Sequence, residues 1–208
     1  MMQAVSALGD TALLAPASAM MVLYLAAWRR WRLSLAFGAA LAFTGVATAA
    51  AKLLFRACGP SFDVGVTSPS GHASFAIAFY GALTLLLAAS APPWRRAFVI
   101  AGAAALLSAI AASRVLLGVH SVAEVVLGSL IGVAGLGIFA ALRESRPGPP
   151  LWPFVLAGGV AAAFVVLTGR HFNAEYPIAR AAARLASLDI CLDGPARRAE
   201  APLGLLRR

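Results

Sequence analysis

Charge is scarce in this 208-residue chain: Asp, Glu, Lys and Arg make up 12% of it, whereas hydrophobic residues make up 61%. Soluble domains usually carry about a quarter charged residues and about half apolar ones. The shortage of charge, together with long uncharged runs, excludes an ordinary soluble domain. It indicates an all-α protein that crosses a membrane several times.

Acidic residues are scarcer still, with 8 Asp and Glu against 17 Lys and Arg and a formal net charge of +9. In a soluble chain this charge would suggest a nucleic-acid partner. The sequence contains no run rich in Lys and Arg and no interleaving of basic and aromatic residues, so we expect no nucleic-acid binding. Arginines in loops beside a membrane explain the charge better.

Cysteine is nearly absent, since Cys58 and Cys191 are the only two. If both lie outside the cytoplasm, an oxidising compartment would permit a disulfide, although the sequence does not give their distance.

Positive charge is also missing before the first apolar run, where a secretory signal peptide would carry it. We therefore expect the first apolar segment to be a retained helix.

Six apolar windows follow one another, each about the 20 residues needed to cross a hydrocarbon core, with Arg114 in the last turn of the fourth and Glu124 in the first turn of the fifth. They are 11–28, 33–51, 73–91, 97–117, 121–142 and 151–169. The sequence thus predicts a six-transmembrane-helix bundle over residues 1–170, of unknown oligomeric state. For the tail, residues 171–208, a short helix on the membrane surface and a solvated segment stay open as alternatives.

Arginines gather in alternate loops of this order, and short cytoplasmic loops are rich in Lys and Arg. The loops after the first, third and fifth windows carry Arg29, Arg30, Arg32, Arg95, Arg96, Arg143 and Arg146. We expect these loops in the cytoplasm and the termini and remaining loops outside. The Ala- and Arg-rich composition suggests a bacterial source, so the membrane would be the inner one and the outer face periplasmic.

Polar residues stand at four helix ends that this topology places on the outer face. They are Lys52, "PSGH" (69–72), Arg114, His120 and Glu124. Each also has a structural explanation. Glu124 completes a capping box with Ser121, Lys52 suits a helix C-terminus, and an interfacial position suits Arg114. These explanations do not account for the gathering of the residues at one surface, and ionisable residues at membrane depth are functional candidates.

The start of the third window suits an anion. Backbone N–H groups at Ser70, Gly71 and His72 would point outward from a helix N-terminus, and the Ser70 hydroxyl adds a donor. Lys52 and Arg114 would supply positive charge, Arg114 as a bidentate fork. The anion implied is phosphate.

Two histidines could then transfer the phosphoryl group. His120 has a carboxylate, Glu124, one helical turn away, which would fix the ring tautomer and suit a nucleophile. His72 has no such partner nearby in sequence, so it is the better general acid.

Lys52, "PSGH" (69–72) and "SRVLLGVHSVAE" (113–124) resemble the signature of the type 2 phosphatidic acid phosphatase superfamily. That signature reads Lys-x6-Arg-Pro, Pro-Ser-Gly-His and Ser-Arg-x5-His-x3-Asp. The resemblance implies a six-helix membrane phosphatase whose site at the outer face uses no metal and no cofactor. It also implies a phosphohistidine on His120, oriented by Glu124.

The substrate implied by the resemblance is a lipid phosphate or diphosphate: a polyprenyl diphosphate, phosphatidate or phosphatidylglycerophosphate. Two alternatives stay open. One is a phosphotransferase that passes the phosphoryl group to a lipid or sugar hydroxyl. The other is a non-catalytic lipid-binding or transport protein on the same scaffold.

Two positions depart from the signature. Gly59 stands where the family has arginine before Pro60, and we hypothesise that Arg56, one turn after Lys52, replaces the missing phosphate-binding cation. Glu124 stands where the family has aspartate. This change keeps the charge and lengthens the side chain by one methylene, so we expect function to survive.

Overall fold

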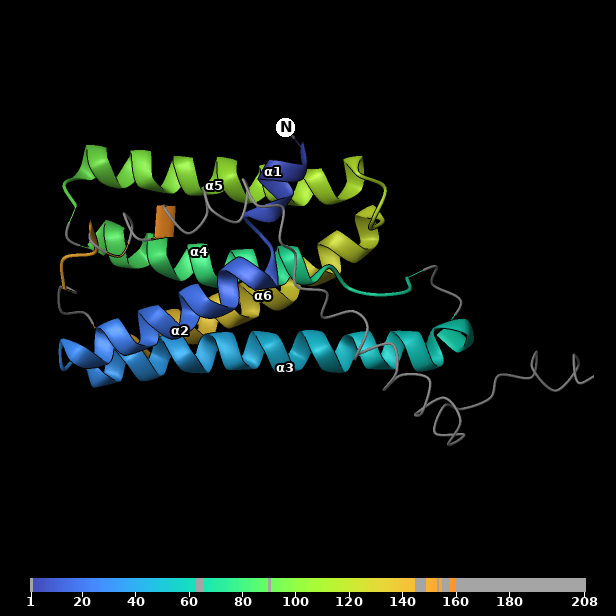
Figure 1. The fold of residues 1–208 in the computed structure, drawn as a ribbon, viewed down its shortest axis with the longest axis horizontal. Coiled ribbons are helices and arrows are strands. Elements are labelled where there is room, and N and C mark those ends of the chain that lie inside the picture. Colours follow the sequence, from blue (N-terminus) through green and yellow to red (C-terminus); the bar gives the residue numbers. More distant parts are fainter. Residues whose placement is uncertain are drawn as a thin grey trace, which may run out of the picture.

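The described part of the chain is all helical and contains no strand (Figure 1). The structure is a computed structural model that describes residues 2–62, 66–89, 91–144, 149–152, 154, 158 and 159, with the backbone alone over 57–62. In chain order the helices are α1 (Met2–Ala7), α2 (Thr11–Ala27), α3 (Trp31–Phe62), α4 (Gly71–Ala89), α5 (Pro93–Leu116) and α6 (Val122–Leu142). The predicted all-α class is confirmed over these residues.

Five stretches are long and apolar enough to cross a membrane, and they correspond to the first five predicted windows. They are Met2–Ala27, Trp31–Arg56, Gly71–Ala89, Pro93–Leu116 and Val122–Leu142. Most of the sixth window, all of the tail and the pairing of Cys58 with Cys191 lie outside the described residues. The chain is thus a multi-pass helical protein, and the count of six spans stays a prediction.

Helix α3 is longer than the sequence predicts, because it continues past the expected end at Lys52 to Phe62. The residues after Lys52, "LLFRAC", include good helix formers and neither Gly nor Pro. The thickness of the membrane limits an apolar span but not a helix. A 32-residue helix is about 48 Å long, well beyond the roughly 30 Å of a hydrocarbon core.

A short helix that the sequence did not predict, α1, lies against α5 (Figure 1). The chain then turns at Gly9, and Asp10 caps the N-terminus of α2: its Oδ1 accepts a hydrogen bond from the Ala12 amide at 2.9 Å. This turn brings the start of the chain to the end of the bundle that carries the predicted polar residues.

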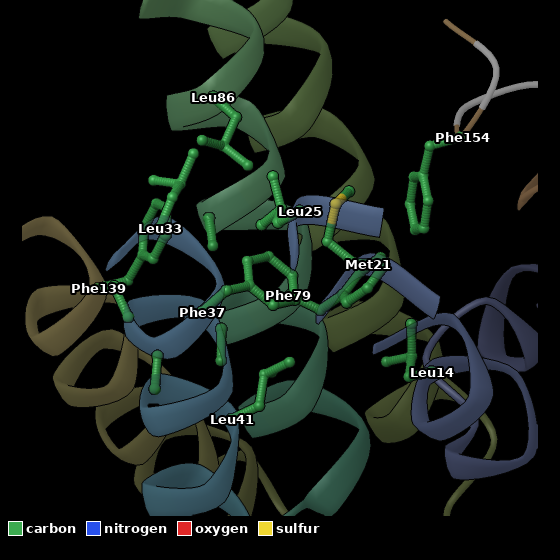
Figure 2. Close-up of a cluster of buried hydrophobic side chains, with 14 of the residues drawn as sticks. Leu14, Met21, Leu25, Leu33, Phe37, Leu41, Phe79, Leu86, Phe139 and Phe154 are labelled. Carbon is green, nitrogen blue, oxygen red and sulfur yellow. The ribbon is translucent and has the colours of Figure 1, made fainter. Parts of the chain in front are cut away.

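The hydrophobic core lies where α2, α3, α4 and α6 meet (Figure 2). The Phe37 ring packs edge-on against Phe79 at 5.9 Å and against Phe139 at 5.8 Å between ring centroids, and Met21 and Leu25 are fully buried beside them. Helix α5, by contrast, leaves most of its apolar side chains exposed. Exposed apolar surface of this kind suits contact with lipid tails.

Glycines on α6 allow it to pack closely on α3 and α4. A Cβ atom on Gly128 would overlap the backbone carbonyl oxygen of Ser70, and one on Gly135 would overlap Thr44 Oγ1. Membrane helices use small residues in this way to bring their backbones together. The close approach at Gly128 places the first turns of α6 against the start of α4.

The arginine-rich turns lie at the opposite end of the bundle from the start of α4 (Figure 1). There Arg30 approaches Glu144 at 3.9 Å, Arg96 Nε donates to the Ala88 carbonyl at 3.3 Å and Arg143 Nη1 donates to the Leu85 carbonyl at 3.4 Å. The helices therefore separate an arginine-rich end from the end with the candidate site.

Candidate active site

Four helices bring the predicted site residues to one end of the bundle. Lys52 comes from α3, Ser70 and His72 from the start of α4, Arg114 from the last turn of α5, and Glu124 from the first turn of α6. The charges of Lys52, Arg114 and His120 all act on His72, so these groups share one electrostatic environment. Residues separated by up to 68 positions in the sequence, from Lys52 to His120, thus meet.

The contact predicted between His120 and Glu124 is present: His120 Nδ1 lies 3.0 Å from Glu124 Oε2, and both side chains are mostly buried, with 11% and 7% of their surface exposed. The capping box is present as well, since Ser121 Oγ accepts from the Glu124 amide and Glu124 Oε2 accepts from the Ser121 amide. The carboxylate that caps α6 is therefore also the one that contacts His120, and its catalytic role stays a prediction.

The other oxygen of Glu124 binds the loop that precedes α4. Its Oε1 accepts from the Thr67 amide at 2.9 Å, the Thr67 hydroxyl at 2.6 Å and the Ser68 amide at 2.9 Å. In addition, the Ser70 amide donates to the backbone carbonyl of Glu124 at 3.0 Å. Glu124 thereby joins the two halves of the site. Sequence reasoning missed Thr67 and Ser68, because nothing in the sequence links them to a residue 57 and 56 positions away.

The start of α4 has the features that the predicted anion site requires, and anion binding there stays a prediction. Ser70 is fully buried and precedes the helix, whose first N–H groups follow at Gly71 and His72. A Cβ atom on Gly71 would lie 3.7 Å from Lys52 Cε and 3.8 Å from Lys52 Nζ, so the lysine side chain reaches the helix N-terminus. Lys52 itself is only 4% exposed. Positive charge and backbone donors therefore face the same small volume.

Arg56 lies one turn beyond Lys52 on α3, because the helix continues as its hypothesised role requires. It is half-buried. It is not among the groups with the largest electrostatic effect on His72 or His120, whereas Lys52 acts on both. The role of Arg56 stays a prediction.

Burial lowers the pKa of the His120 imidazole below its ordinary value, and the charges of Arg114 and Lys52 act in the same direction, while the hydrogen bond and charge of Glu124 oppose them. His120 is therefore the neutral imidazole at neutral pH. Because Nδ1 faces a carboxylate, it carries the ring proton and leaves the lone pair on Nε2. The ring is in the form that a nucleophile needs.

This lowered pKa predicts the acid limb of the pH–rate profile. As the pH falls through the pKa of His120, the ring gains a proton and loses its nucleophilic lone pair, so kcat/KM is expected to fall with a midpoint below pH 6.5. In Glu124→Gln, which lacks the opposing charge, the midpoint should move lower still. Comparison of the two profiles cancels the ionisation of the substrate. A midpoint that rises in Glu124→Gln would contradict the assignment.

Sequence reasoning also missed three residues of the first turn of the chain. Arg114 Nη1 donates to Ser6 Oγ at 2.6 Å, Gly9 packs on the His72 side chain, and the buried carboxylate of Asp10 acts electrostatically on His72. The sequence contained one signal, an aspartate in an otherwise uncharged N-terminal stretch.

No group of three His, Cys, Asp or Glu side chains within the described residues could hold a metal ion.

Comparison with known proteins identifies the family to which the chain belongs. The model of the PAP2 superfamily matches residues 33–148, which include every predicted site residue from Lys52 to Glu124. The chain belongs to the PAP2 superfamily. The predicted resemblance to the type 2 phosphatidic acid phosphatases is thereby confirmed. Membership in the PAP2 superfamily supports an enzyme of the phosphatase type, in agreement with the multi-pass helical fold.

A relative of this PAP2 protein is the "Uncharacterized 22.5 kDa protein in cps region" of Klebsiella pneumoniae. It is 31% identical over 205 residues, which cover 95% of this chain and 96% of the relative. The similarity therefore extends over both chains almost entirely, including the segments on either side of the family match. No solved structure matches this chain.

Proposed function

We propose that this PAP2 protein hydrolyses a lipid phosphate or diphosphate through a phosphohistidine on His120. The observation that carries the proposal is the 3.0 Å contact between His120 Nδ1 and Glu124 Oε2 at the end of the bundle where α4 begins. A neutral imidazole with a free Nε2 next to an anion site suits nucleophilic attack on phosphorus.

In the proposed reaction, His120 Nε2 attacks phosphorus while the bond from phosphorus to the leaving oxygen breaks. His72 gives its proton to that oxygen, so the alcohol or the shortened phosphate leaves protonated. Water then attacks the phosphohistidine and gives its proton to His72, which releases phosphate and restores both rings. Each histidine therefore returns to its starting form.

The oxygens of the transferred group are held by positive charge and backbone donors. Lys52, the Gly71 amide and the Arg114 guanidinium would neutralise the charge that spreads over the equatorial oxygens in the transition state. These groups suffice to bind the phosphoryl group without a metal ion, and we expect none to be needed.

A lipid is the favoured substrate because the site lies at one end of apolar helices. The acyl or prenyl chain can stay in the bilayer while the headgroup enters between the helix ends. We place this end on the outer face of a bacterial inner membrane, since the arginine-rich turns lie at the other end. The Klebsiella relative supports a bacterial source.

The test is phosphate release by the purified protein from a panel of polyprenyl diphosphates, phosphatidate and phosphatidylglycerophosphate, with EDTA present. Hydrolysis of at least one lipid in EDTA supports the proposal. Turnover that requires an added hydroxyl acceptor would identify the phosphotransferase instead. Lipid binding without turnover would identify the non-catalytic alternative, for which the departure at Gly59 is the argument.

Arg56→Ala tests whether that arginine replaces the cation missing at Gly59. A charge-assisted hydrogen bond to phosphate contributes about 1.5–3 kcal/mol, so kcat/KM should fall about 10- to 100-fold. The matched control is Arg32→Ala, which removes an arginine from the opposite end of the same helix. If Arg56→Ala and Arg32→Ala retain the same kcat/KM as the unaltered protein, Arg56 does not bind the substrate.

A further inference from the structure

We propose that residues Ser6–Asp10, which we call the N-terminal elbow, belong to the active site and position Arg114 and His72. The inference rests on the proposed function, but it concerns residues that precede the family match at 33–148. The elbow ends α1 and leads into α2, and its backbone is ordered by hydrogen bonds from the Gly9 amide to the Ser6 carbonyl and from the Asp10 amide to the Ala7 carbonyl.

Ser6 holds the guanidinium of Arg114. The hydroxyl accepts a hydrogen bond from Arg114 Nη1 at 2.6 Å, and Ser6 is only 5% exposed. A short bond to a buried acceptor restricts the rotation of the guanidinium, so the charge is in place before the phosphoryl group arrives. Preorganisation of this kind improves binding without any contact between Ser6 and the substrate.

Gly9 covers the side chain of His72. A Cβ atom at Gly9 would lie 3.2 Å from His72 Cβ, 3.4 Å from His72 Cδ2 and 2.9 Å from Ile110 Cγ2, so a larger residue would displace the ring or the helix. Tyr80 Oη donates to the Leu8 carbonyl at 2.8 Å and fixes the elbow against α4. The imidazole thus packs against backbone that cannot easily move.

Asp10 supplies the negative charge beside His72. Four charged or titratable groups act on this ring from the elements around it: Asp10 from the elbow, Lys52 from α3, Arg114 from α5 and His120 from the loop before α6. Asp10 is the one acid among these four, and it is only 5% exposed. Its negative charge opposes the effect of the other three groups and so favours the protonated ring that a general acid needs. Asp10 is thus a positioning residue.

Asp10→Asn tests the link to His72, because asparagine keeps the helix cap and removes the charge. A lipid phosphate releases an alkoxide that needs a proton, whereas p-nitrophenyl phosphate releases a phenolate that does not. We expect kcat to fall about 30-fold on the lipid phosphate and less than about threefold on p-nitrophenyl phosphate. Equal losses on both substrates, or no loss on either, would overturn the role of Asp10.

Ser6→Ala tests the link to Arg114. Weaker positioning of the guanidinium should raise KM about tenfold on both substrates with little change in kcat, and should weaken binding of orthovanadate by a similar factor. The matched control is Ser18→Ala on α2, whose hydroxyl donates to the Leu14 carbonyl at 2.5 Å. Thermal unfolding of all variants is measured alongside, so that a loss of fold is not counted as a loss of positioning.

The outcomes separate this inference from the proposed function. If the unaltered protein hydrolyses a lipid phosphate and both elbow variants behave like Ser18→Ala, the inference alone is wrong. If the unaltered protein neither hydrolyses any lipid phosphate nor binds orthovanadate, the proposed function is wrong and the inference falls with it. Orthovanadate binding tests Ser6 even in a protein without turnover.

Discussion

His120→Ala is expected to lower kcat/KM by about 10⁴-fold or more, because it removes the atom that forms the covalent bond to phosphorus. Lys52, the α4 N-terminus and Arg114 remain in this variant, so binding of inorganic phosphate should change by less than about tenfold. Phosphate release by the purified protein gives kcat/KM, and titration of the same protein with inorganic phosphate gives the binding affinity. A short incubation with ³²P-labelled substrate should label the unaltered protein and leave His120→Ala unlabelled.

His72→Ala is the matched comparison, since it removes the other histidine and leaves the nucleophile. It should still acquire the label from a substrate with a good leaving group, such as p-nitrophenyl phosphate. Label that persists in His120→Ala, or that disappears only in His72→Ala, would reverse the roles of the two rings.

Glu124→Ala is expected to lower both stability and activity strongly. The Glu124 carboxylate accepts hydrogen bonds from the Thr67 amide and hydroxyl, the Ser68 amide and the Ser121 amide, and it contacts His120 Nδ1. A buried donor left without an acceptor, such as the Ser68 amide, costs about 1–3 kcal/mol, so the loop before α4 should be held less firmly against α6. The expected result is a lower Tm and a fall in kcat/KM of about 10³- to 10⁴-fold.

Glu124→Asp separates the loss of the negative charge from the loss of the side chain's reach. Aspartate, the family's own residue, keeps the charge, but its shorter side chain reaches the His120 side and the Thr67 side less well at the same time. We expect activity between those of Glu124→Ala and the unaltered protein. The matched control is Glu144→Gln, which removes the carboxylate that faces Arg30 at the far end of the bundle. The two groups are 3.9 Å apart and partly exposed, and such an ion pair contributes little. A Glu144→Gln protein as impaired as Glu124→Ala would show that the loss is not specific to the site.

The helices were predictable from the sequence because apolar windows of membrane length carry their own signal. The spacing between His120 and Glu124 was equally informative, since one helical turn brings position i+4 next to position i. The length of α3 was not predictable from hydropathy, because hydropathy marks the apolar span and does not show whether the helix continues beyond it. The short helix α1 and its turn left no periodic signal in six residues.

The partners of Glu124 show where the sequence was insufficient. The capping box follows from four consecutive residues, whereas the bonds to Thr67 and Ser68 depend on how α6 packs against the loop before α4. That packing is set by the close approach of Gly128 to the Ser70 carbonyl. No local sequence pattern encodes these contacts, because they depend on how two segments distant in the sequence pack together.

The sequence by itself determined the family and the membrane-length helices and pointed to a chemistry, because residue types and short spacings are local properties. Composition indicated the membrane, and three motifs from Lys52 to Glu124 identified a PAP2 protein. Only the tertiary structure decided that one carboxylate joins both halves of the site and that the N-terminal elbow reaches Arg114 and His72. The physical reason is that such contacts depend on the relative placement of packed helices, which is a property of the whole bundle.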